Sequence, residues 1–238
     1  MHARRLQVIR FPQGTRIFAD RKAAGRALAQ ALAHLREVPD VVVLALPRGG
    51  VPVAYEIAER LGAPLDVYVV RKLGVPGQPE YAMGAIASGG GRVVNEEVVD
   101  ALGIDPAAID AIAEKESREI LRREQAYRGN RTPLDVAGKT VIVVDDGMAT
   151  GSTMLAGVRA LRQLHPARII LAVPHAPPDT CATLSREVDE LVCLEMPEPY
   201  LAVGRWYGEF PQIEDAEVTD LLERARDAEL RRASAARG

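Results

Sequence analysis

The sequence predicts an α/β protein built on a doubly wound, mainly parallel sheet. Continuous aliphatic runs of strand length recur along the chain, and unbroken runs of this kind are typical of parallel strands that are buried on both faces. Segments with helical spacing of apolar residues lie between several of these runs, and strands that alternate with single helices indicate this fold class. The runs lie at residues 41–46, 65–70, 141–144, 168–173 and 190–194.

The size and composition of the chain limit its class. Its 238 residues are enough for one large α/β domain or two small ones. The 47% of hydrophobic and 26% of charged residues are ordinary for a soluble globular protein. The net charge of -3 gives no reason to expect nonspecific binding to nucleic acid, and the lack of an 18-residue apolar stretch makes a membrane span unexpected.

The cysteines and the first residues of the chain indicate the cellular compartment in which the protein is expected. Cys181 and Cys193 have neither C-x-x-C spacing nor a histidine at metal-ligand spacing, so we expect buried thiols rather than a disulfide or a zinc site. Residues 1–6 are not followed by the apolar run of a secretory signal. We therefore expect a cytoplasmic protein.

In the first half of the chain, predicted helices and strands alternate as the fold class requires. Asp20 is a good cap for a helix that runs to about residue 35. A buried strand at 41–46 precedes a helix at 51–61, in which Pro52 is tolerated in the first turn. A second buried strand is expected at 65–70. Residues 74–91 are rich in Gly and Pro, which predicts a long mobile excursion that contains short strands.

The second half continues the alternation. Asn95 and Asp105 are plausible helix caps, and residues 107–128 form a charged, mostly solvated extra helix. The strand at 141–144 leads into a helix at 154–164. The later elements are a strand at 168–173, a helix near 179–187, a strand at 190–194 and a last helix at 215–232, with a frayed Arg- and Ala-rich tail after residue 229.

The segment 141–154 carries the strongest functional signal. Four aliphatic residues lead to Asp145 and Asp146, and a turn with Gly and Thr then enters a helix. Carboxylates beside the backbone N–H groups of a helix start suit a ligand with sugar hydroxyls and a phosphate, such as a phosphorylated ribose. The turn lacks the lysine of a Walker A loop. The alternative is an ordinary strand end with an Asp-Gly turn and a helix cap.

Candidate ligand-binding residues follow three of the other strands. Pro47-Arg48-Gly49-Gly50 follows the strand at 41–46, Arg71-Lys72 follows that at 65–70, and His175 follows that at 168–173. Because ligands of open α/β sheets bind beyond the carboxyl ends of the strands, these groups and the acidic pair should share one rim. Their charges match a substrate with a pyrophosphate and a diol.

On these motifs, residues 41–194 resemble the type I phosphoribosyltransferases. The segment 141–154 looks like the loop that binds 5-phosphoribosyl-1-pyrophosphate (PRPP) in that family. Pro47–Gly50 is similar to the family's pyrophosphate turn, which often contains a non-proline cis peptide, and 71–77 resembles the R-K-x-G-x-P-G run of adenine phosphoribosyltransferases. The resemblance implies one domain over residues 1–238, with a core at about 38–195 and a small hood formed from 1–37 and 196–238.

The resemblance also implies roles for individual residues. The family uses PRPP and Mg²⁺ to transfer a 5-phosphoribosyl group to a nitrogenous base, and releases pyrophosphate. Asp145 and Asp146 would hold the ribose hydroxyls and the waters of the metal. The 5-phosphate would contact Ala149, Thr150, Gly151, Ser152 and Thr153. Pyrophosphate would contact Pro47, Arg48, Gly49, Gly50, Arg71 and Lys72.

Less of the base site can be inferred. Ala149 stands where hypoxanthine-guanine enzymes carry an aspartate, so Glu80 in the 74–91 lid is the nearest candidate for a general acid or base; the alternative is a solubilising loop glutamate. In this family a variable hood covers the base, here residues 16–18 and 200–212. The base-pocket candidates are His175, Trp206 and Tyr207, although these aromatics could equally anchor the last helix, and His175 could be structural.

Two further expectations follow from the resemblance. A homodimer is a reasonable expectation, because basic residues of some relatives reach the pyrophosphate of a neighbouring subunit. The other function class is a non-catalytic PRPP- or nucleotide-sensing regulator of the same fold. Regulators that bind nucleic acid usually bring a basic face or an added module, and neither is evident here, so we do not expect a nucleic-acid partner. The sequence does not name the base.

Overall fold

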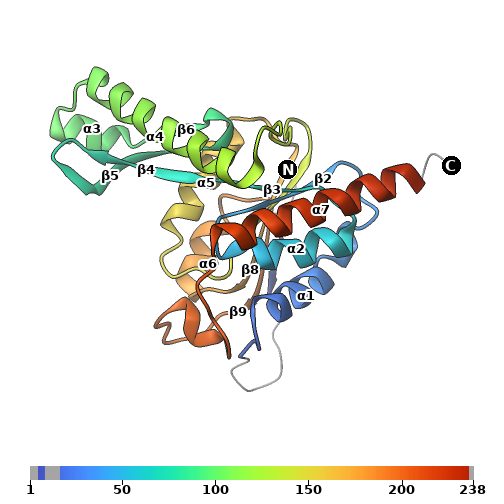
Figure 1. The fold of residues 1–238 in the computed structure, drawn as a ribbon. Helices are drawn as coiled ribbons and strands as arrows, with labels where there is room; N and C mark the ends of the chain where they lie inside the picture. The colour runs from blue at the N-terminus through green and yellow to red at the C-terminus, as the bar shows by residue number, and fades with distance from the viewer. Residues whose placement is uncertain (1–4, 9–16, 236–238) are drawn as a thin grey trace.

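The computed structural model describes residues 5–8 and 17–235, and its centre is a six-stranded sheet of order β1-β9-β8-β7-β2-β3 (Figure 1). Every neighbouring pair in this sheet is parallel. The predicted fold class is therefore confirmed. The strands are β1 (Arg5–Val8), β2 (Val41–Ala45), β3 (Leu65–Val67), β7 (Thr140–Val144), β8 (Arg168–His175) and β9 (Glu190–Glu195).

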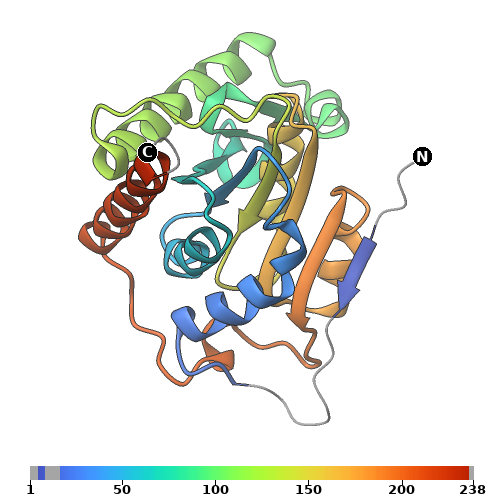
Figure 2. The same cartoon turned by 90° about the vertical axis from the view of Figure 1, so that its right-hand side faces the viewer.

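Helices cover both faces of this sheet, which explains why its strands are apolar throughout (Figure 2). Alternate residues of β2, such as Val43 and Val42, point into two separate cores. On one face lie α1 (Arg21–Ala31), α2 (Gly50–Leu61) and α7 (Asp215–Ala235). On the other face lie α5 (Ser152–Arg162) and α6 (Pro178–Leu184).

The winding direction reverses between β2 and β7. The chain leaves β2 through α2 to reach β3 on one side, whereas it leaves β7 through α5 on the opposite face to reach β8 on the other side. A crevice opens beyond the carboxyl ends of the strands at such a reversal, and ligands of doubly wound sheets bind there. The loops at 47–50 and 145–151 both begin at this point.

A second, three-stranded antiparallel sheet projects from the first as an arm (Figure 1). It consists of β4 (Val70–Val75), β5 (Gln78–Ala87) and β6 (Arg92–Val94), and α3 (Glu96–Leu102) and α4 (Pro106–Arg128) pack on it. The predicted strand at 65–70 is therefore wrong in its second half, because the chain leaves the main sheet after Val67. Strands were expected within 74–91, and the structure has them as part of a paired hairpin that closes around a tight turn at Gly77, where φ is +77°.

Other differences concern the ends of elements. The strand β1 was not expected, since its four residues alone carry no clear strand pattern; it pairs with β9 at the edge of the sheet. The helix α7 continues to Ala235, so residues 230–235 are helical and not frayed as expected, whereas the last three residues lie outside the described part of the chain. Short 3₁₀ turns lie at Ala33–Leu35, Ser88–Gly90 and Val203–Trp206. No helix among the described residues has the length and hydropathy needed to span a membrane.

The extra helix α4 is less solvated than its charge suggests. It buries Ile109, Ala113 and Ile120 against the arm. At its other end, the buried Arg128 donates to Asp66 at 3.0 Å and to Glu124 at 3.3 Å. Asp66 also accepts from the backbone N–H of Leu134 at 3.2 Å. These bonds fasten the end of α4 to β3, so the arm is tied to the main sheet by a buried ionic cluster.

Candidate functional site

The loops that follow β2 and β7 touch at the reversal point of the sheet. The peptide between Pro47 and Arg48 is cis. A Cβ atom on Gly49 would overlap the carboxylate of Asp146, and a Cβ atom on Gly50 would lie 2.7 Å from the carbonyl oxygen of Val144. Both positions therefore require glycine, because no side chain can occupy the space between the two loops.

The carboxyl group of Asp145 lies at the end of β7 in an apolar and acidic environment. One of its oxygens accepts a hydrogen bond from the backbone N–H of Asp146 at 2.9 Å. Burial of the carboxyl group, followed by the negative charge of Asp146, raises the pKa of Asp145 well above its ordinary value. Part of the residue remains accessible. A ligand that brings positive charge or hydroxyl donors would stabilise its ionised form.

The carboxylate of Asp146 is buried and already paired. Its Oδ2 lies 2.7 Å from Nε of Arg21, the first residue of α1, and both side chains are about nine-tenths buried. The backbone carbonyl of Asp146 accepts a hydrogen bond from the hydroxyl of Tyr207 at 2.5 Å. Sequence reasoning missed Arg21, since a single arginine at the start of a helix gives no signal of a partner 125 residues away.

The turn from Ala149 to Thr153 leads into the amino end of α5. Gly151 is the cap of this helix, with φ +66°, and its carbonyl accepts from Leu155 N–H at 2.8 Å. The carbonyl of Ala149 accepts from the hydroxyl of Thr180 at 2.7 Å, which fixes the turn against α6. Thr150, Ser152 and Thr153 are exposed. Helix amino ends with free N–H groups attract anions, so this turn can bind a phosphate.

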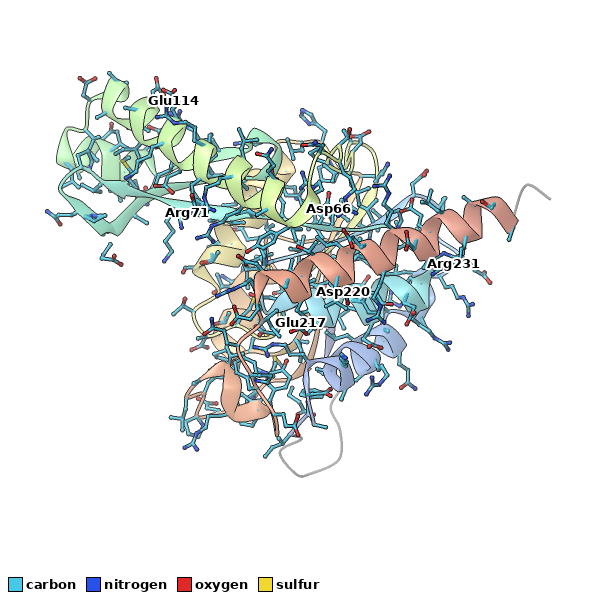
Figure 3. All side chains as sticks on the ribbon, in the orientation of Figure 1. Asp66, Arg71, Glu114, Glu217, Asp220 and Arg231 are labelled. Carbon is cyan, nitrogen blue, oxygen red and sulfur yellow. The ribbon has the colours of Figure 1, made fainter. Side chains whose placement is uncertain are left out.

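A cleft of about 610 Å³ lies between the arm and this turn. It brings Thr153 together with three residues predicted from the sequence, Arg71, Lys72 and Glu80. The helix α4 adds Lys115 and Glu116 to its lining. Figure 3 shows Arg71 on the arm strand below α4. The cleft therefore combines positive side chains with Thr153, a residue of the turn predicted to bind phosphate.

The cationic side chains of the site have acidic neighbours. Arg71 donates from Nε to an oxygen of Glu116 at 2.7 Å. Arg48 lies 3.8 Å from Glu214 and 3.7 Å from Asp215 at the start of α7, and both carboxylates are well exposed. Exposed pairs at such distances are weak, so Arg48 can turn toward an anion. Glu116 was not expected to have a role, because α4 carried no motif.

The three base-pocket candidates lie together in an aromatic cluster at the end of β8. His175 is fully buried, and its ring centroid lies 5.4 Å from that of Tyr207 and 6.1 Å from that of Trp206. Its Nδ1 lies 2.9 Å from the hydroxyl of Tyr200. Burial lowers the pKa of His175 to about 4, so the ring is neutral. The cluster holds the hood against the carboxyl end of β8.

The hood is formed by the segment 200–212 and the residues before α1. Tyr207 pairs with Phe18 in a parallel bridge, and the Gly208 N–H donates to the carbonyl of Phe18 at 2.7 Å. Phe18 is buried and Ile17 is exposed, whereas residue 16 lies outside the described part of the chain. Within residues 5–8 and 17–235, His175 Nε2 and Trp206 Nε1 are buried without a hydrogen-bond partner.

The side chains at the acidic pair suit a metal ion whose other ligands are waters and substrate phosphates. No group of three or more His, Cys, Asp or Glu residues in the described part of the chain has metal-binding geometry. Asp146 is engaged by Arg21, whereas the partly exposed residue Asp145 has no ion pair among the contacts described for it. Mg²⁺ usually keeps several waters and binds through one or two carboxylates together with substrate phosphates. The donor set therefore fits Mg²⁺ held mainly by a phosphorylated ligand.

Comparison with known proteins decides the family. Residues 15–198 match the family model described as a phosphoribosyl transferase domain. The chain belongs to this family. A Mycobacterium tuberculosis protein named as a candidate phosphoribosyl transferase is 48% identical over 210 residues, which cover 88% of this chain and 47% of that protein. The chain thus spans about half the length of this curated relative.

Two further relatives of this phosphoribosyl transferase family member match different shares of its chain. The crystal structure of TT1426 from Thermus thermophilus is 39% identical, covers 87% of this chain and 98% of its own, and superposes with a TM-score of 0.78. A protein of Chloroflexus aurantiacus named bifunctional protein PyrR is 34% identical over 129 residues, which cover 53% of this chain and 65% of that protein. The first confirms the fold over the main body of the chain.

Proposed function

We propose that this protein transfers the 5-phosphoribosyl group of PRPP to a ring nitrogen of a nitrogenous base. The C1–oxygen bond to pyrophosphate breaks, a C1–nitrogen bond forms, and the proton of the attacking nitrogen leaves to a base. The observation that carries the proposal is the contact between the Gly49 loop and Asp146 at the reversal point of the sheet. This contact supports the proposal because it brings the loop proposed for pyrophosphate against the acidic pair proposed for the ribose diol.

The ribose is held from the end of β7. The carboxylate of Asp145 accepts hydrogen bonds from the ribose hydroxyls, while Asp146 keeps the turn in place through its bonds to Arg21 and Tyr207. The 5-phosphate lies at the amino end of α5, against the backbone of 149–153 and the hydroxyls of Thr150, Ser152 and Thr153. Fixing both ends of the sugar orients C1 toward the hood.

The leaving pyrophosphate is stabilised by positive charge and backbone N–H groups. The 47–50 loop lets its backbone approach the anion, and Arg48 adds charge. Arg71 and Lys72 approach from the arm across the cleft that they share with Thr153. Bound Mg²⁺ would neutralise charge on the pyrophosphate, with Asp145 holding its waters. Because negative charge grows on the leaving group, these contacts strengthen in the transition state.

Glu80 is the proposed proton acceptor or donor for the base. It is exposed on β5 at the mouth of the cleft, so it reaches the base only when the arm closes over the ligand. Closure also excludes water that would hydrolyse the sugar cation. We expect Glu80→Gln to slow turnover more than it weakens PRPP binding. Equal losses of turnover and of PRPP affinity would contradict a role of Glu80 in proton transfer.

The proposal is tested by mixing the protein with PRPP, Mg²⁺ and a panel of purine and pyrimidine bases, and measuring pyrophosphate release. We expect release with at least one base. The double variant Asp145→Asn/Asp146→Asn should lose activity by about 10²-fold or more, a size typical for loss of groups that position and stabilise charge. Asp227→Asn, an exposed change on α7, is the matched control. Unchanged turnover in the double variant would contradict the site.

The second candidate is a regulator that binds PRPP or a nucleotide without catalysis. Two observations favour it: the similarity to proteins named bifunctional protein PyrR, and the engagement of Asp146 and Arg71 in ion pairs. Binding of PRPP with no pyrophosphate release across the whole panel would support this function over the first.

A further inference from the structure

Arg21 connects the acidic pair to the hood. It is the first residue of α1, which is capped by Asp20 through a hydrogen bond of 2.6 Å from Ala23 N–H. Its guanidinium donates from Nε to Asp146 Oδ2 at 2.7 Å and from Nη1 to the carbonyl of Pro211 at 2.7 Å. Its Cζ also lies 3.7 Å from the centre of the Phe210 ring. One buried side chain therefore contacts both the carboxylate and the hood.

A second connection runs beside the first. The hydroxyl of Tyr207 donates to the backbone carbonyl of Asp146, and the Tyr207 ring stacks on Phe210 at 5.0 Å between centroids. The hood residues 207–211 are therefore attached to Asp146 through its carbonyl and, by way of Arg21, through its carboxylate. Phe210 is 37% exposed, and its ring lies between the Tyr207 ring and the Arg21 guanidinium, which are its contacts at this end of the hood.

The chemistry of the Arg21 guanidinium suits a side chain that holds Asp146 and the hood at the same time. A guanidinium has a rigid planar set of donors and can bond two acceptors in fixed directions at once. Hydrogen bonds between a guanidinium and a carboxylate are shorter and stronger than those between neutral groups. A lysine in this place can bond the carboxylate or the carbonyl, but its single nitrogen does not reproduce the fork.

We propose that Arg21 is a positioning residue that fastens the hood segment 200–212 to Asp146, so that the sugar-binding turn and the cover of the base site move as one unit. The contacts that carry this proposal are present without any ligand. Its consequence for PRPP rests on the proposed function: a ligand that orders the Asp145–Asp146 turn also orders the hood.

The single tryptophan of the chain, Trp206, lies within the hood, so its fluorescence reports hood opening directly. We would measure acrylamide quenching in the free protein for the wild type, Arg21→Gln, Arg21→Lys and Phe210→Ala. Arg26→Gln is the matched control, because Arg26 is on the same helix and is exposed beside Glu56. We expect the quenching constant to rise at least twofold in Arg21→Gln and by less in Arg21→Lys, and to stay unchanged in Arg26→Gln.

Asp146→Ala supplies the decisive comparison. If the link passes through the carboxylate, Asp146→Ala raises quenching as Arg21→Gln does, and the double variant rises no further. Thermal melts by circular dichroism check that each variant is folded, and Arg21→Lys keeps the buried charge if Arg21→Gln does not fold. Quenching in folded Arg21→Lys and Phe210→Ala equal to that of the wild type would overturn the proposal, and so would additive effects of Arg21→Gln and Asp146→Ala.

A second arm adds PRPP with Mg²⁺ and measures binding by calorimetry. We expect PRPP to lower Trp206 quenching in the wild type and to leave it unchanged in an Arg21 variant that still binds. Failure of the wild type to bind PRPP would count against the proposed function alone, and the free-protein comparison would still decide the link. PRPP binding that reduces quenching equally in the wild type and Arg21→Gln would overturn the coupling.

Discussion

The carboxylate of Asp146 fills the space beside Gly49 that a Cβ atom would occupy. These residues are far apart in the sequence, and they meet because β2 and β7 are neighbours in the sheet, with Ala45 opposite Val144. The absence of a side chain at Gly49 lets the 47–50 loop approach the acidic pair. The two loops of the candidate site are therefore matched in shape.

We predict that Gly49→Ala forces these two loops apart. Overpacking of a close contact typically costs about 1–3 kcal/mol of unfolding free energy, and we expect a loss in this range together with loss of pyrophosphate release. Thermal unfolding and the activity assay measure the two effects. Gly49→Ala in an Asp146→Ala background tests the cause, because the overlap is then absent. A stability loss of the same size in both backgrounds would contradict the explanation.

Asp145 predicts a pH dependence of stability. Its pKa is raised from 3.8 by burial and by Asp146, so the folded protein keeps this proton at pH values where the unfolded chain has lost it. The free energy of unfolding therefore falls as pH rises from about 3.8 to the folded pKa, and is flat above it. In metal-free buffer, Asp145→Asn should melt above the wild type at pH 7, and this gain should vanish below pH 4. A gain that does not change with pH would contradict the prediction.

From His175 we predict a pH dependence of stability with the opposite sign. Its pKa is lowered from 6.5 to about 4 by burial, so between these values the unfolded chain binds a proton that the folded protein does not. Stability is therefore lost as pH falls from 6.5 to 4, by about 3 kcal/mol for a shift of this size. Denaturant unfolding of the wild type and His175→Gln between pH 4 and 7 gives the difference. Parallel curves for the two proteins would contradict it.

The sheet and the rim of charged loops could be predicted from the sequence because their signals are local. An unbroken aliphatic run such as 141–144 identifies a strand that is buried on both faces, and a parallel sheet places the residues after each strand on the same edge. The cap residues Asp20, Asn95 and Asp105 were predicted for the same reason, since each bonds to an N–H group two or three residues later.

The partners of these charged residues could not be predicted, because they depend on packing between distant segments. Nothing near Arg21 indicates that it pairs with Asp146, or near Arg71 that it pairs with Glu116. The arm was misread for a related reason. Its strands include glycines, such as Gly74 and Gly84, at which a Cβ atom would overlap a neighbouring backbone, and composition alone assigns such residues to a loop.

The pair Arg71–Glu116 gives the last prediction, which concerns anion binding in the cleft. Glutamine in place of Glu116 keeps an oxygen that can accept the bond from Arg71, but it removes a negative charge 2.7 Å from the guanidinium. We therefore expect Glu116→Gln to bind inorganic pyrophosphate several-fold more tightly at low salt, and the gain should shrink as salt screens the charge. Calorimetry at two ionic strengths measures both effects.

The matched control for this change is Glu114→Gln on the same helix. Glu114 lies away from Arg71 in Figure 3 and forms only an exposed pair with Arg118 at 3.6 Å among the contacts described for it. The control removes the same charge from α4 at a greater distance from the cleft, so its effect on pyrophosphate affinity should be much smaller. Equal changes in the two variants would mean that the net charge of α4, and not the pairing of Arg71, sets anion affinity. Weaker binding in Glu116→Gln would instead mean that the carboxylate is needed to hold Arg71 in its binding position.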